Sequence, residues 1–156
     1  MTVHPLAEPF LSVGDAASPR GRIGVLLSHG FTGSPASMKG WGEYLAAQGY
    51  AVSVPRLPGH GTTWQEMNTT TWADWNAEVE RAFEALSNQV DSVFVCGLSM
   101  GGGLALRLAA DHPDRVAGLV LVNPAVGSAR KDVKLLPVLK HVIASFPGIA
   151  NDIKKP

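Results

Sequence analysis

A single serine lies among glycines in the stretch FVCGLSMGGGLAL, which runs from Phe94 to Leu106. The five residues GLSMG match the pattern G-x-S-x-G, in which a sharp strand-to-helix turn exposes a serine hydroxyl as a nucleophile. The pattern alone is weak, because glycine and serine also form ordinary turns. Here an apolar, strand-like run precedes Ser99 and a helix-forming run follows it. We therefore interpret Ser99 as a catalytic nucleophile, with a purely structural turn as the alternative.

The glycines around Ser99 are those that such a turn needs. Missing side chains at Gly97 and Gly101 allow the strand and the helix to approach closely. Gly102 and Gly103 would each weaken a helix by about 1 kcal/mol, a cost that close packing would explain. The helix N-terminus behind the serine also favours developing negative charge.

A serine nucleophile requires donors for the oxyanion that forms on the substrate. The stretch SHGFTGS, Ser28–Ser34, follows a strand-like run and precedes a helix, so it is expected at the same carboxyl edge of the sheet. We predict that the backbone amides of Phe31 and Met100 are these donors, each supplying about 3–4 kcal/mol of transition-state stabilisation. The alternative is that HGFTG is an ordinary strand-to-helix turn.

The elements that must position these groups alternate along the chain. Four apolar runs are predicted strands covered on both faces, and a short edge strand is possible near Phe10–Val13. The four runs are Arg22–Gly30, Tyr50–Leu57, Ser92–Ser99 and Val116–Ala125. Their alternation with helices predicts an α/β fold with a mostly parallel sheet and helices on both faces.

Three helices are predicted between these strands. The first is capped by Ser34, has Pro35 in its first turn and ends at Gly49. The second is capped by Thr71 or a neighbouring threonine and carries a helically spaced apolar stripe. The third runs from about Met100 to Ala110, where His112-Pro113 ends it. The stripe of the second helix is Trp72, Trp75, Val79, Phe83 and Leu86.

The motifs HGFTGS, PRLPGHG and GLSMGG, in this order and spacing, resemble the amino-terminal half of an α/β-hydrolase. Among these enzymes the sequence resembles bacterial monoacylglycerol lipases and related carboxylesterases, from AEPF through HPDRVAGLVLVNPAV. The resemblance implies a serine hydrolase of acylglycerols or simple esters, with Ser99 as nucleophile and Phe31 and Met100 supplying the oxyanion amides. It also implies a core over residues 1–128 and the beginning of a cap, or lid, over residues 129–156.

The sequence departs from this family because the acid and the histidine base of the catalytic triad, expected after the cap, are not among the 156 residues. Asp111, His112 and Asp114 lie about 18 Å from Ser99, at the other end of its helix. His29 and His60 lie in glycine-containing turns at the correct edge, where ring-to-backbone hydrogen bonds are commoner than catalysis. His4 and His141 are interpreted as surface or packing residues. We therefore expect a partial fold that is inactive alone and is completed by the remainder of its own chain.

The composition of the chain indicates which classes of partner it binds. Lysine plus arginine equals aspartate plus glutamate, thirteen each, so no overall field attracts nucleic acid. We expect a small-molecule lipid or ester substrate, no cofactor, no metal and at most transient membrane-surface contact through the cap. Cys96, the only cysteine, is predicted to be buried and inert. Without a signal-peptide pattern or a membrane span, the protein is predicted to be cytoplasmic.

The expected reaction is two-step acyl transfer through an acyl-enzyme, with a monoacylglycerol as first substrate. A short-chain carboxylesterase is the runner-up, and a catalytically silent binding protein is the rival from another class. The tryptophans Trp64, Trp72 and Trp75 are predicted to be core residues rather than an acyl pocket. Lys39 and Arg56 are predicted to be solvated surface residues.

Overall fold

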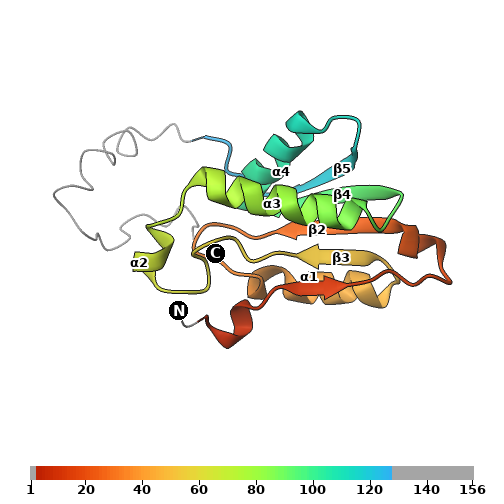
Figure 1. Ribbon diagram of the computed structural model, residues 1–156, viewed down its shortest axis with the longest axis horizontal. Coiled ribbons are helices and arrows are strands. Elements are labelled where there is room, and N and C mark those ends of the chain that lie inside the picture. The colour runs from red at the N-terminus through yellow and green to blue at the C-terminus, as the bar shows by residue number, and fades with distance from the viewer. Residues whose placement is uncertain (1–2, 128–156) are drawn as a thin grey trace, which may run out of the picture. The chain divides into compact units, whose positions relative to one another are not determined.

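The computed structural model describes residues 3–127 as an α/β unit (Figure 1). Within this range five strands alternate with helices, as the apolar runs predict. The strands are β1 (Phe10–Ser12), β2 (Ile23–Ser28), β3 (Ala51–Val54), β4 (Ser92–Leu98) and β5 (Val116–Val122). The α-helices are α1 (Ala36–Ala47), α2 (Trp64–Met67), α3 (Trp72–Ser87) and α4 (Met100–Asp111), with 3₁₀ turns η1 at Pro5–Ala7 and η2 at Pro19–Arg22.

The strands form one sheet in the order β1-β3-β2-β4-β5. β1 runs antiparallel to β3, pairing Phe10 with Val54, whereas the other neighbouring strands are parallel. The predicted edge strand and the mostly parallel sheet are thus confirmed. Because parallel strands present their carboxyl ends at one edge, the segments after β2, β3, β4 and β5 lie at that edge.

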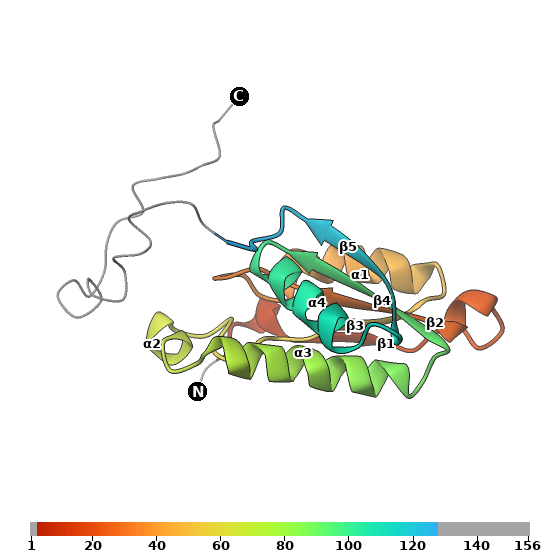
Figure 2. The same cartoon turned by 90° about the horizontal axis from the view of Figure 1, so that it is seen from above.

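Helices cover both faces of the sheet (Figure 2). On one face α1 packs its Met38 against apolar side chains that include Leu27 and Cys96. On the other face α3 and α4 pack together, with Phe83 and Leu104 among the completely buried residues. Most residues of the central strands β2 and β3 are buried, which explains their nearly uninterrupted apolar runs.

The helix ends follow local sequence signals in three cases out of four. Thr71 caps α3 in a capping box with Asp74, as predicted. His112 stands at the carboxyl end of α4, also as predicted. The predicted Ser34 cap of α1 is wrong: Pro35 occupies the cap position and no side chain caps the helix there. Gly49 ends this segment with φ +93°, a conformation that suits glycine.

One short helix was not predicted from the sequence, and one predicted segment lies outside the described residues. The short helix α2 was not predicted, although its capping box of Thr63 and Glu66 is readable as T-x-x-E. The predicted cap over residues 129–156, with His141, lies outside the described residues. In the described part of the chain, no helix is both long and apolar enough to cross a membrane.

Candidate active site

Ser99 occupies the turn between β4 and α4 in a strained backbone conformation. Its φ is 53° and its ψ is −116°, which a residue with a β-carbon adopts only when its surroundings impose it. The surroundings are evident: the Ser99 N–H donates to the Val122 carbonyl, and the Ser99 carbonyl accepts from Ala125 and Gly102, each at 2.9 Å. The side chain is partly exposed and caps no helix. These hydrogen bonds fix the main chain of the turn, and within residues 3–127 the hydroxyl makes no hydrogen bond.

The glycines of the turn are required by close backbone contacts. A β-carbon at Gly97 would lie 2.3 Å from the Gly101 carbonyl oxygen, and one at Gly101 would lie 2.3 Å from the Ser28 oxygen. At Gly102 the nearest atom would be a Pro124 side-chain carbon at 2.7 Å. All these distances are below any that real β-carbons show. The predicted reason for the glycines is thus confirmed.

The loop after β2 forms a tight turn beside the serine. The Gly33 N–H donates to the Gly30 carbonyl at 3.1 Å, and Thr32 has φ 58°. A β-carbon at Gly30 would lie 3.2 Å from the Ser99 β-carbon and 3.8 Å from its hydroxyl oxygen. The amides of Phe31 and Met100 donate to no acceptor within residues 3–127. Two unused donors therefore belong to the two turns that meet at Ser99.

His29 orients one of these amides. The ring is completely buried; its Nδ1–H donates to the Gly30 carbonyl at 3.0 Å, and its Nε2 accepts from the Leu57 N–H at 3.2 Å. The Gly30 carbonyl and the Phe31 N–H belong to one planar trans peptide, in which they point in opposite directions. The histidine that holds the carbonyl therefore also sets the direction of the Phe31 amide.

Burial keeps both edge histidines neutral. Loss of hydration lowers the pKa of His29 to about 4 and lowers the pKa of His60 as well. His60 Nδ1–H donates to the Pro58 carbonyl at 3.0 Å. The prediction that these rings bond to backbone is confirmed. No histidine among residues 3–127 hydrogen-bonds to the Ser99 hydroxyl, so the described residues provide no histidine base for it.

His112 is at the far end of α4, as predicted, and contacts Glu80 of α3. With Glu84 these residues are the one group in the described chain whose ligand atoms, all within 4.8 Å of one another, could hold a metal ion. Glu84 is paired with Arg115 at 2.5 Å. Through these contacts and the pair of Glu84 with Arg115, the group links α3 to the segment that follows α4.

Three side chains at the carboxyl edge differ from the sequence predictions. Trp64 and Trp72 are 59% and 44% exposed, so the prediction that they are core residues is wrong, whereas Trp75 is partly buried against the core. Arg56 is half-buried rather than solvated, and its Nη1 donates to the His60 carbonyl at 3.4 Å. Lys39 is exposed as predicted and lies 3.9 Å from Glu43. The spacing of the tryptophans indicated which face of a helix they share. It did not indicate that the beginning of that face extends beyond the sheet and is exposed.

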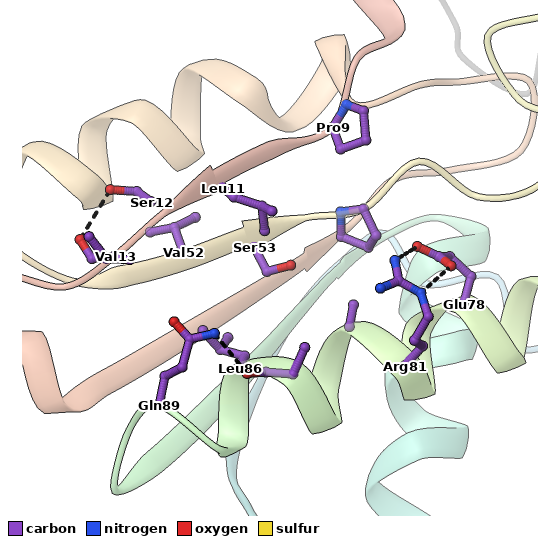
Figure 3. Close-up of a pocket in the computed structure, with 13 residues that line it drawn as sticks. Pro9, Leu11, Ser12, Val13, Val52, Ser53, Glu78, Arg81, Leu86 and Gln89 are labelled. Carbon is purple, nitrogen blue, oxygen red and sulfur yellow. Dashed lines mark hydrogen bonds and ion pairs between the residues drawn. The ribbon is translucent and has the colours of Figure 1, made fainter.

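A cavity of about 330 Å³ lies between β1, β3 and α3 (Figure 3). Leu11, Ser53 and Leu86 are among its lining residues, and the ion pair between Glu78 and Arg81 is part of its wall. Neither Ser99 nor the turn at Gly30 lines it. This cavity is therefore separate from the candidate active site.

Comparison with known proteins places the chain in a family. Residues 19–153 match the family model described as serine aminopeptidase, S33. The chain belongs to this family of α/β-hydrolases. The fold class expected from the sequence is thereby confirmed.

Individual relatives are named for lipid and ester hydrolysis. The chain is 48% identical over 120 residues to a thermostable monoacylglycerol lipase from Bacillus sp. (strain H-257), covering 77% of this chain and 45% of the lipase. It is 38% identical over 118 residues to a carboxylesterase from Bacillus subtilis (strain 168), covering 75% of this chain and 47% of that enzyme. A solved structure from a study of the metagenome-derived lipolytic enzymes LipS and LipT superposes with TM-score 0.86 at 44% identity, covering 97% of this chain and 59% of that one. The chain thus spans about half the length of the curated relatives it matches.

Proposed function

We propose that the protein containing this chain is a serine ester hydrolase that acts on monoacylglycerols through an acyl-enzyme. The observation that carries the proposal is the strained Ser99 beside the turn at Gly30, whose hydroxyl has no hydrogen-bond partner within residues 3–127. The relatives named as a monoacylglycerol lipase and a carboxylesterase support the substrate class.

In the proposed mechanism the Ser99 hydroxyl oxygen attacks the ester carbonyl carbon, and the carbonyl oxygen takes the negative charge. The amides of Phe31 and Met100 are proposed to bind this oxyanion, which is supported by their having no acceptor within the described residues. A histidine elsewhere in the full protein takes the serine proton and returns it to the leaving glycerol. Water then attacks the acyl-enzyme, with the same histidine as base, and releases the fatty acid.

The same proposal assigns the parts of the chain. Residues 1–128 form the hydrolase core, and residues 129–156 begin a cap over the acyl pocket that makes at most transient contact with a membrane surface. No nucleic acid takes part, as the balanced charge indicates. The free, buried Cys96, whose pKa burial raises to about 11, supports a cytoplasmic location because such a thiol needs no oxidising compartment.

A short-chain carboxylesterase is the second candidate, favoured by the 38% identity to the Bacillus subtilis carboxylesterase. The two candidates differ in acyl length and alcohol. Hydrolysis of 1-monoacylglycerols and of ethyl esters with increasing acyl length by the full-length protein separates them. The monoacylglycerol proposal predicts higher kcat/KM for the glycerides, whereas preference for short ethyl esters would support the carboxylesterase.

The decisive test of the nucleophile uses Ser99→Ala in the full-length protein. We expect kcat to fall by about 10⁶-fold, since removal of a serine nucleophile leaves only binding and oxyanion stabilisation. A fluorophosphonate probe is expected to label the wild type and not the variant, while Ser37→Ala, which changes a surface serine of α1, keeps both activity and labelling. Labelling that persists in Ser99→Ala would refute the assignment, and an unlabelled, inactive wild type would support the silent binding protein.

A further inference from the structure

His60 is buried at the active edge without a place in the reaction described above. It follows β3 in the loop PGHG, between Gly59 and Gly61, whose φ values are +74° and +70°. These left-handed conformations suit glycine and allow the chain to turn the intervening side chain inward. The ring of His60 is 1% exposed.

His60 is the centre of an aromatic cluster, which we define as His29, Phe31, His60 and Trp75. Its ring centroid lies 5.0 Å from that of His29, 5.3 Å from that of Trp75 and 6.2 Å from that of Phe31, with edge-on geometry in each case. Phe31 and Trp75 also contact each other, at 6.0 Å. His60 is the one member whose ring contacts the rings of all three others, and such edge-on contacts are attractive.

One carbonyl anchors two members of this cluster, His60 and Trp75. The Pro58 oxygen accepts from His60 Nδ1–H at 3.0 Å and from Trp75 Nε1–H at 3.1 Å. Trp75 Nε1–H is also 3.0 Å from the Thr70 hydroxyl oxygen. The rings of His60 and Trp75 are therefore fixed relative to the loop after β3 and to α3, which makes them a rigid support.

Phe31 depends on this support because it lies on a turn outside any helix or strand. Its side chain is 54% exposed, and its aromatic neighbours are His60 and Trp75. We infer that His60 is a positioning residue for ester hydrolysis: its ring holds the Phe31 side chain, and with it the Phe31 amide, in place beside Ser99. This inference rests on the proposed function, since it concerns the oxyanion donor of that reaction.

Stability alone does not account for an imidazole at this position. The Nε2 atom of His60 is buried and has no hydrogen-bond partner within residues 3–127, which is a cost that a phenyl ring would avoid. The imidazole contributes instead the Nδ1–H bond that sets the orientation of the ring. Replacing His60 with phenylalanine should therefore lower kcat in part, while the thermal midpoint stays equal or rises.

The test measures kcat, KM and thermal midpoint for full-length His60→Phe and His60→Ala on a 1-monoacylglycerol. We expect kcat to fall about tenfold or more in His60→Ala, with KM nearly unchanged, because a misplaced donor weakens transition-state binding above all. His60→Phe keeps a ring and is expected to recover much of this loss, with a thermal midpoint equal to or above that of the wild type. His112→Ala is the matched control: it removes a partly buried histidine that packs on Phe83 at the far end of α4 and should lower the thermal midpoint without lowering kcat.

Phe31→Ala provides a second route if His60→Ala does not fold, because the Phe31 side chain is largely exposed. This variant removes the ring that His60 holds and should reduce kcat by about the same factor as His60→Ala. In the double variant Phe31→Ala/His60→Ala the two losses of kcat should not add. Wild-type kcat in Phe31→Ala, a change in KM alone, or a His112→Ala variant in which kcat falls as far as it does in His60→Ala would overturn the inference. A full-length wild type without esterase activity would instead refute the proposed function, and this inference with it.

Discussion

Backbone strain in this chain is concentrated at single residues around the candidate site. The three non-glycine residues with positive φ among those described are Thr32, Ser99 and Asn123, which follow β2, β4 and β5. Asparagine tolerates this region, but for β-branched threonine it is a true outlier. Each such residue costs on the order of 1 kcal/mol, so the surrounding fold must stabilise all three. All three follow parallel strands at the carboxyl edge, so the backbone strain coincides with the candidate site.

A prediction at this scale concerns the acid sensitivity of His29. Its folded pKa of about 4 lies below the ordinary value of 6.5, so the unfolded chain binds more protons between these pH values. The contribution of neutral His29 to the free energy of unfolding is fully present above pH 6.5. It is lost as the pH falls towards 4, and the total loss is on the order of 3 kcal/mol. Urea unfolding at pH 7.5, 6 and 5 should show this decline in the wild type.

The control is His29→Gln, which has no imidazole to protonate. Its overall stability should be lower at pH 7.5, and the slope of stability against pH between 6.5 and 5 should be smaller than in the wild type. His60 contributes to the same slope with the same sign, because its pKa is also lowered by burial. Equal slopes in wild type and His29→Gln would contradict the assignment of a neutral His29 that accepts from Leu57.

Single-residue roles could be predicted where the chemistry is local. The ring-to-backbone bonds of His29 and His60 follow from their glycine-containing turns, and the burial of Cys96 follows from its apolar run. The exposure of Trp64 and the burial of Arg56 could not be predicted in the same way. Both depend on how the loop after β3 packs against η1 and α3, which are separate in the sequence.

At the scale of elements, the fold depends on the contact between α4 and β2. This contact brings the serine turn and the turn at Gly30 together, and it needs a glycine at position 101. In Gly101→Ala the new β-carbon would be 2.3 Å from the Ser28 oxygen and 2.5 Å from the His29 oxygen. Since both are backbone atoms, the helix must move, and we expect a destabilisation of at least about 2–3 kcal/mol by chemical denaturation.

Gly40→Ala is the matched control in this experiment. Gly40 is an exposed residue inside α1, and a β-carbon there would have no atom within 4 Å. Alanine should stabilise the protein by about 0.5–1 kcal/mol, because it is the better helix former. If Gly101→Ala unfolded at the same denaturant concentration as wild type, the close approach of α4 to β2 would not be what requires the glycine.

The strands and long helices could be predicted because each has a periodic or uninterrupted apolar pattern. β2 and β4 lie within their predicted runs, and α3 begins at the predicted cap Thr71. The short helix α2 has no such pattern, since one turn of helix buries no apolar stripe. The start of α1 differs from the prediction because the side chain of Ser34 makes no cap bond, although Ser37 Oγ–H donates to the Ser34 carbonyl.

At the scale of the whole molecule, the described residues leave one part of the sheet with exposed apolar side chains. Phe94 pairs with Gly118 across β4 and β5, and Val120 and Val122 occupy alternate positions on β5, so all face the same side. Phe94, Val120 and Val122 are 38%, 43% and 42% exposed. α1 covers the part of this face formed by β2 and β3. The sequence predicted apolar strands, but it did not indicate which strand faces the helices would leave exposed.

The consequence can be tested on the polypeptide of these 156 residues. An exposed apolar face beside a strand edge promotes association, so we expect sedimentation velocity to show concentration-dependent oligomers. Val120→Lys places a charge on this face and should raise the apparent dissociation constant about tenfold, equivalent to about 1.4 kcal/mol of lost association energy. Val13→Lys is the control, because Val13 is 79% exposed and lies just beyond β1, outside β4 and β5. A monomeric wild type, or equal effects of the two lysines, would show that the face formed by Phe94, Val120 and Val122 does not drive association.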